Sequence, residues 1–218
     1  MFFVIACSLP GAIPGDGGNS GPTVEPPVPA SGTVLFQDDF ENPLSGWDTA
    51  SNPDGIMNYN NGVFRILVDT PEINFWSTPN KVFTDTRVEV DTAKFGGPDA
   101  NRAGVICRFD GAQYYFFVIS SDGYYGVGRL LRNADNTSLV TLLGQDQMMF
   151  SAYIKIGVAV NHLRADCAGS ALTFYVNGFQ VAQVTDTQLT SGRVGLTAGA
   201  FDEGGVDIIF DQFIVLQP

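Results

Sequence analysis

The chain has 218 residues, of which 44% are hydrophobic and 16% are charged, and its formal net charge is −12. This length suits one large all-β domain or two small ones, and the apolar fraction is enough for a real core. Charge is below the usual share of about a quarter, whereas glycine (25) and phenylalanine (17) are abundant, which favours strands and tight turns. The excess of 23 acidic over 11 basic residues argues against a nucleic-acid partner.

The first seven residues resemble the end of a bacterial lipoprotein signal. Val4-Ile5-Ala6-Cys7 resembles a lipobox, in which the peptide is cut before a cysteine that then carries lipid. The basic front part of such a signal is missing, so residues 1–7 are interpreted as a truncated lipoprotein signal, which suggests a truncated or late-called start codon. A chance apolar N-terminus is the alternative. The resemblance implies lipidation of Cys7 and contact with a membrane through that lipid only.

Residues 8–32 form the next segment, a predicted tether. Positions 8–31 hold six prolines, five glycines and no lysine or arginine, too little apolar surface for a folded core. We expect this segment to be disordered or extended. A lipobox followed by a tether and a globular domain is the usual layout of a surface lipoprotein, which predicts an extracytoplasmic, lipid-anchored protein of the bacterial cell surface. No apolar run approaches the roughly 20 residues of a membrane-spanning helix.

From residue 33 onward the pattern predicts strand after strand. Turn signals such as Asp122-Gly123 and Asn177-Gly178 separate short runs rich in β-branched and aromatic residues, and only residues 145–151 suggest a helical turn. The expected strands are 34–36, 63–68, 87–91, 103–109, 113–120, 124–131, 138–143, 153–160, 161–167, 171–176, 179–184, 193–200 and 206–216. Many short strands at regular spacing indicate an all-β antiparallel sandwich or barrel, and a dozen or so strands favour the two-sheet jelly roll.

A family resemblance supports this fold. Phe36-Gln37-Asp38-Asp39-Phe40, followed by Gly46-Trp47, resembles the opening of concanavalin A-like lectin/glucanase jelly rolls, closest to the group with 3-keto-disaccharide hydrolase domains. Further blocks in family order are Gly104–Phe109, Tyr115–Ile119, Leu172–Gly178, Gly192–Leu196 and Phe210–Phe213. The resemblance implies a two-sheet antiparallel β-sandwich over residues 33–218. It says little about activity, because this fold hosts enzymes, lectins and passive interaction modules.

Alternation along the predicted strands suggests a binding face. A two-residue turn at Asp122-Gly123 would pair Ser121 with Tyr124 and place aromatic and guanidinium side chains together on the solvent side. Aromatic rings stack on sugars and guanidinium groups bind hydroxyls, so a glycan ligand is predicted. The expected ligand-binding residues are Tyr114, Phe116, Tyr125, Arg129 and Arg108. The alternative is that these are ordinary solvent-facing residues, with the aromatics lying under a loop.

The evidence for catalysis is incomplete. Retaining glucanases of the resembled superfamily carry Glu-x-Asp-x-x-Glu on one strand, but here Glu89-Val90-Asp91 is followed by Lys94 where the second glutamate would stand. Glycoside hydrolysis needs two carboxyl groups, one of them protonated. Glu89 and Asp91 are therefore weak catalytic candidates, and a solvated strand face is the alternative. His162 is the only histidine, which excludes a multi-histidine metal site, and no cofactor is required.

Cysteines and acidic loops complete the predicted sites. Cys107 and Cys167 share inward parity on two strands, so a disulfide between them is favoured slightly over two buried thiols. The pairs Asp38-Asp39 and Asp202-Glu203 are compatible with a structural Ca²⁺, although neither has the spacing of a defined calcium loop.

Three functions therefore remain open. The leading hypothesis is a lipid-anchored module that binds a polysaccharide or an envelope protein without catalysis. The alternatives are a glycoside hydrolase or 3-keto-disaccharide hydrolase-like enzyme, and an accessory structural subunit of a surface assembly.

Overall fold

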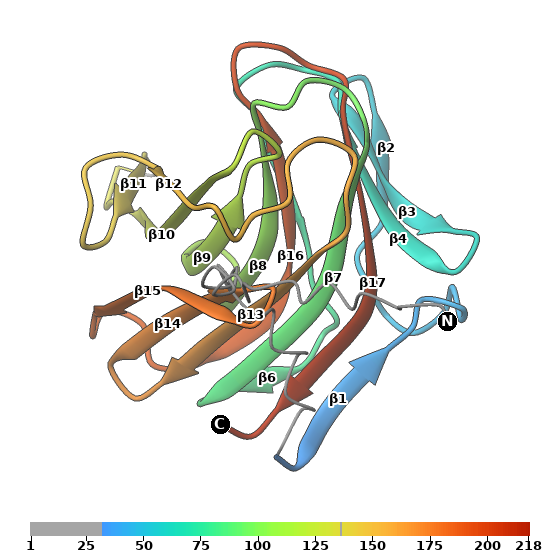
Figure 1. The fold of residues 1–218 in the computed structure, drawn as a ribbon. Coiled ribbons are helices and arrows are strands. Elements are labelled where there is room, and N and C mark those ends of the chain that lie inside the picture. Colours follow the sequence, from blue (N-terminus) through green and yellow to red (C-terminus); the bar gives the residue numbers. More distant parts are fainter. Residues whose placement is uncertain (1–31, 136) are drawn as a thin grey trace, which may run out of the picture.

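The computed structural model describes residues 32–135 and 137–218, and this part of the chain is a sandwich of two antiparallel sheets (Figure 1). The described residues form strands, turns and loops without a helix, so no helix among them is long and apolar enough to cross a membrane. Residues 1–31, with Cys7 and the predicted lipobox and most of the tether, lie outside the described residues.

One layer is a nine-stranded sheet. Its order is β15 (Phe179–Thr185), β14 (Ala171–Val176), β13 (Asn161–Ala168), β7 (Thr86–Gly96), β17 (Val206–Leu216), β4 (Val63–Val68), β3 (Gly55–Asn60) and β2 (Ala50–Asn52), with β1 (Val34–Asp38) also paired to β17. Figure 1 shows the two long strands β7 and β17 side by side at the centre of this layer.

The other layer is an eight-stranded sheet. Its order is β11 (Ser138–Leu142), β10 (Tyr124–Arg132), β9 (Tyr114–Ile119), β8 (Asn101–Phe109), β16 (Gly192–Ala200) and β5 (Asn74–Ser77), with β12 (Met149–Phe150) on β10 and β6 (Val82–Phe83) on β16. The chain passes between the layers from β7 to β8 and from β16 to β17, so strands distant in sequence become neighbours.

The core fills the space between the sheets. Alternate residues of each strand point inward, which gives β13 its strict pattern: Leu163, Ala165 and Cys167 are fully buried, whereas their neighbours are half-exposed. A disulfide joins Cys167 to Cys107 on β8, the pair that shares inward parity in the sequence, and it links the two sheets across 60 residues of chain.

Most predicted strands are present, but residues 153–160 form a loop, not a strand. The Asn161 side chain accepts a hydrogen bond from the Lys155 amide (2.9 Å) and donates one to the Lys155 carbonyl (2.9 Å), which folds the segment back on itself. Gly157 has a φ of 71°, incompatible with a strand, and Ile156, Val158 and Val160 are exposed. Residues 145–151, where a helical turn was expected, contain bends and β12.

Candidate functional site

The predicted register of the β9–β10 hairpin is wrong by one residue. Gly123, with a φ of 100°, closes a three-residue loop in which the Ser120 amide donates to the Tyr124 carbonyl (2.7 Å). Tyr125 therefore pairs with Ile119, and Arg129 with Tyr115, so both point between the sheets. A one-residue shift moves every side chain of a strand to the opposite face. The five predicted ligand-binding residues consequently do not share one face.

Arg129 holds a loop instead of facing solvent. Its guanidinium bonds to Asp186, whose carboxylate also accepts the Tyr115 hydroxyl (2.6 Å) and the Gln188 amide (2.9 Å). Burial disfavours the charged carboxylate, but these donors outweigh it and hold the pKa of Asp186 below its usual range. Tyr125 packs, partly buried, against the main core.

Arg108 is likewise internal. It has a φ of 55° and sits in a β-bulge where Phe109 and Ile106 pair with Arg193 and Gly195. The bulge directs its guanidinium to the Leu189 carbonyl (2.7 Å) and to Asp85 (3.2 Å), leaving Arg108 only 2% exposed. The expected outward orientation of Arg108 is therefore wrong, and the Phe109 ring instead lies on the outer face, beside Trp76 and Tyr114.

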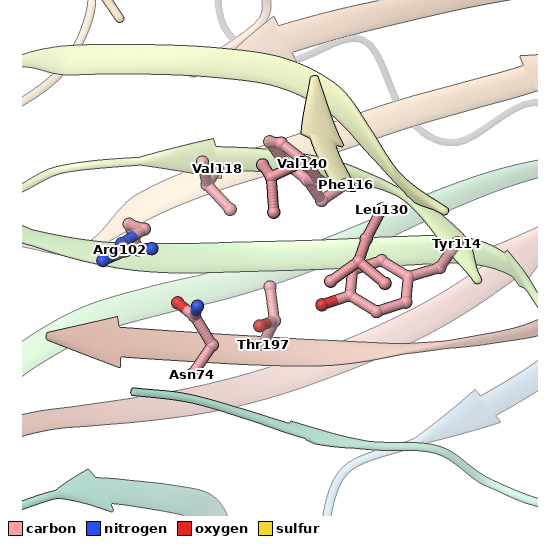
Figure 2. A pocket seen from close by; sticks show the side chains of 8 residues that line it. All are labelled: Asn74, Arg102, Tyr114, Phe116, Val118, Leu130, Val140 and Thr197. Carbon is pink, nitrogen blue, oxygen red and sulfur yellow. The ribbon is translucent and has the colours of Figure 1, made fainter. Parts of the chain in front are cut away.

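Tyr114 and Phe116 do lie on the outer face of the eight-stranded sheet, where they line a recess of about 60 Å³ (Figure 2). The other lining residues come from β5, β8, β9, β10, β11 and β16: Asn74, Arg102, Val118, Leu130, Val140 and Thr197. Beneath it, Gly104 pairs with both Thr197 and Val118, and a side chain at this position would collide with the Phe117 carbonyl of β9. Figure 2 shows Arg102 and Asn74 at one end and Tyr114 at the other.

The recess joins an aromatic cluster. Trp76, which is 38% exposed, lies 5.9 Å from the Tyr114 ring and 6.2 Å from Phe109, and the Arg193 guanidinium lies 4.8 Å above Phe109. Burial raises the pKa of Tyr114 to about 12, so its hydroxyl keeps its proton at neutral pH.

Sequence reasoning missed Asn74, Trp76, Arg102, Arg193 and Thr197. Strand β5 was not expected at all, because it has four residues and its only signals are two adjacent aromatics. The alternation Asn74, Trp76 could have placed these two on one face. What it could not show is that β5 pairs with β16, next to β8.

A second cluster occupies the outer face of the nine-stranded sheet. The His162 imidazole lies between Asp91 (Nδ1–Oδ1, 2.8 Å) and Glu89 (Nε2–Oε2, 3.5 Å) on the neighbouring strand β7. Hydrogen bonds to Asp91 and then to Glu89 raise the pKa of His162 to about 9, against the opposing effect of burial. His162 also borders a hollow of about 540 Å³ between β17 and the loop after β1, lined by Gln37, Asp39 and Gln212 among others.

This cluster is poorly suited to glycoside hydrolysis. One glycosidase carboxyl group has to hold a proton for the leaving group, whereas here both carboxylates pair with the same imidazole. A histidine protonated at neutral pH is not a general base either. Glu89 and Asp91 thus share a cation across two strands, as a structural ion pair does.

Comparisons with known proteins identify the fold. The chain matches no family model and no curated protein. Among solved structures, it is similar to the carbohydrate-binding module CBM66 from Bacillus subtilis, at 15% identity and a TM-score of 0.52, over 79% of this chain and 96% of the module. It is also similar to a family 16 endo-glucanase from Bacteroides ovatus, at 10% identity and a TM-score of 0.60, over 84% of this chain and 100% of the enzyme. The fold is that of the concanavalin A-like lectins and glucanases.

A B. subtilis protein of unknown function with a galectin-like fold gives the same result, at 12% identity and a TM-score of 0.61, over 86% of this chain and 97% of that one. At such identities the likeness shows the concanavalin A-like fold alone.

Asp38, in the first acidic loop of this concanavalin A-like domain, is engaged by the protein itself. Both Asp38 oxygens already accept hydrogen bonds, from the Phe40 amide (2.9 Å) and the Trp47 indole (2.9 Å). Within the described part of the chain, no group of three or more His, Cys, Asp or Glu side chains could hold a metal ion. Structural Ca²⁺ stays a prediction of the sequence that these contacts do not support.

Proposed function

We propose that this chain is an extracytoplasmic module that binds a glycan on the outer face of its eight-stranded sheet and does not cleave it. The observation that carries the proposal is the recess between Arg102 and Tyr114, bordered by the exposed ring of Trp76. An exposed aromatic ring next to a few convergent polar groups is the usual chemistry of sugar recognition.

Two polar groups of the recess are available to a ligand. Neither the Asn74 amide nor the Tyr114 hydroxyl forms a hydrogen bond with another described residue. Such groups gain most from a ligand that supplies hydroxyls, because an unpaired buried donor costs about 1–3 kcal/mol. The printed name of one structural neighbour, a carbohydrate-binding module, supports the same ligand class.

Two features support export and anchoring. The disulfide between Cys107 and Cys167 is typical of proteins that mature in an oxidising compartment. The lipobox-like string ending at Cys7 supports a lipid anchor, followed by the tether of residues 8–32. Changing Cys7 to alanine in a bacterial host should then release the protein from the membrane fraction, and an unchanged distribution would contradict the anchor.

Absence of catalysis is proposed because the carboxylates of the expected half-motif are engaged. Glu89 and Asp91 flank His162 on the sheet opposite the recess, so no carboxyl pair faces the proposed ligand from the strands of the eight-stranded sheet. A glycoside hydrolase needs two such groups around the scissile bond.

A glycan array, followed by chromatographic product analysis on every hit, tests the proposal. We expect binding to at least one polysaccharide and no new products after prolonged incubation. Products from a bound glycan would replace the proposal by the hydrolase alternative. Binding to no glycan would overturn it in favour of an accessory subunit that contacts a protein.

A further inference from the structure

The strands of the eight-stranded sheet carry positive charge without negative charge. They contain no aspartate or glutamate, although the whole chain has 23 acidic residues, but they contain Arg102, Arg108, Arg129, Arg132 and Arg193. The outer face of this sheet therefore receives no carboxylate from its own strands.

Two of these arginines are neutralised from inside the protein. Arg108 pairs with Asp85, and Arg129 pairs with Asp186, in both cases through a loop at the edge of the sandwich. They serve the fold and are directed away from the outer face.

Arg102 and Arg193 differ, because neither forms an ion pair with a described residue. Arg102 donates to the Ala200 carbonyl (2.6 Å) and lies 4.1 Å from the Phe201 ring, while its Nε is buried without a partner. The Arg193 guanidinium lies 4.8 Å from the Phe109 ring. Aromatic rings stabilise guanidinium groups without neutralising their charge.

Partial burial disfavours the charged form of the Arg102 guanidinium. Burial lowers its pKa, and the opposing effects of Tyr114 and Glu72 are smaller. A guanidinium that is partly withdrawn from water and forms no direct ion pair gains when an anion arrives. The recess beside it, about 60 Å³, has room for a few water-sized groups, which fits a carboxylate or a sulfate but not a whole sugar ring.

We propose, building on glycan binding at this face, that the ligand is an acidic polysaccharide whose carboxylate or sulfate groups pair with Arg102 in the recess and with Arg193 beyond Trp76. Gly199, the partner of Arg102, stands six residues from Arg193 on β16, a separation of roughly 20 Å along an extended strand. Trp76 pairs with Thr197, which lies between them. Several linked sugars cover such a distance, and a single sugar does not.

The proposal is tested with the full chain and matched polymers. Dissociation constants are measured by calorimetry for polygalacturonate, alginate, a sulfated galactan, and polygalacturonate whose carboxyl groups have been reduced to alcohols. At least one acidic polymer should bind about 10-fold or more tightly than the reduced polymer, and increasing salt should weaken its binding. The uronate and sulfate polymers show which anion is preferred.

Variants locate the charge pairing. Arg102→Gln should weaken acidic-glycan binding about 10-fold or more, the range for losing a hydrogen bond between charged groups, and Arg102→Lys should retain part of it. Arg164→Gln removes the same charge from the opposite outer face and should leave binding unchanged. If Arg102→Gln unfolds, Arg193→Gln provides the same test with less burial.

Each other outcome overturns the inference. Equal binding of the neutral and acidic polymers, unaffected by either arginine variant, would refute the acidic ligand and leave glycan binding intact. Binding to poly-glutamate as tight as to the polyuronates would indicate an acidic protein partner. Binding to no polysaccharide would refute both the acidic ligand and the proposed function.

Discussion

The two outer faces of the sandwich handle charge in opposite ways. On the nine-stranded sheet, cations and carboxylates neutralise each other: Arg65 bonds Asp207 of the neighbouring strand through two nitrogens (2.8 and 2.7 Å), and Arg164 bonds Asp166 of its own strand β13 in the same way (2.9 and 2.5 Å). On the eight-stranded sheet, arginines stand among aromatic rings and the strands contain no acid.

On the nine-stranded sheet the charged groups are already paired with each other, whereas on the eight-stranded sheet guanidinium groups can still bind a partner. Cross-strand ion pairs satisfy their own hydrogen bonds and contribute modestly to stability. The unpaired guanidinium groups beside the exposed tryptophan do not stabilise the fold through ion pairs, so they can bind a partner. The weak catalytic candidates of the sequence, Glu89 and Asp91, lie on the first face. The residues that support binding lie on the second.

The largest expected effect concerns the disulfide that holds the two faces back to back. Replacing both Cys107 and Cys167 by alanine should lower the free energy of unfolding by about 4 kcal/mol, because the bond closes a 60-residue loop in the unfolded chain. Urea denaturation measures this. Without reductant, the unfolded wild type should expose at most one reactive thiol, that of Cys7, and three would contradict the bond.

The next expected effect is a difference in stability between variants of an inward-facing and an outward-facing arginine on strand β10. Arg129→Ala should cost about 2–3 kcal/mol of stability, since it leaves the nearly buried carboxylate of Asp186 without its cation. Arg132→Ala, an exposed change at the end of the same strand, should cost under about 0.5 kcal/mol. Thermal and urea unfolding compare the two. If Arg129→Ala instead abolished glycan binding in a protein of unchanged stability, the ligand role originally predicted for Arg129 would stand.

Trp76→Ala tests which outer face binds the glycan. Loss of a central aromatic contact typically costs about 2 kcal/mol of binding, or about 30-fold in the dissociation constant. The matched change on the nine-stranded sheet is Tyr175→Ala, whose ring lies 4.4 Å from the Arg164 guanidinium. It should leave affinity unchanged. The reverse result, with Tyr175 decisive and Trp76 neutral, would transfer the site to the other face.

The smallest expected effect is a pH dependence of stability that arises from His162 on the nine-stranded sheet. The pKa of His162 is raised from 6.5 to about 9 in the folded protein, so its stabilising effect is complete below pH 6.5 and is lost as pH rises through 9. Because the side chain is 35% exposed, solvent screening reduces this effect to about 1 kcal/mol. Urea unfolding at pH 6, 7.5 and 9 should show the decline in wild type and a smaller one in His162→Asn. Parallel pH profiles would refute the ion pairing.

Much of the fold could be predicted from local patterns. The strict alternation around Leu163 identified β13 and its inward residues, and the turn signals separated most strands correctly. The strand predicted over residues 153–160 was wrong. The apolar alternation of this segment is typical of a strand, but the contacts that fold it into a loop come from the side chain of Asn161. Strand β5 was not predicted for the opposite reason, since four residues are too few to show a periodicity.

The sequence alone therefore determined the β-sandwich, the cysteine pair and the faces of strands such as β9 and β13. These features depend on a two-residue periodicity, which can be recognised from consecutive residues. Only the tertiary structure decided which face each arginine reaches. One extra loop residue at Ser121-Asp122-Gly123 turned Arg129 inward, and one bulge turned Arg108 inward and Phe109 outward. The recess between Arg102 and Tyr114 likewise exists only because β5, β8, β9, β10, β11 and β16 assemble from distant parts of the chain.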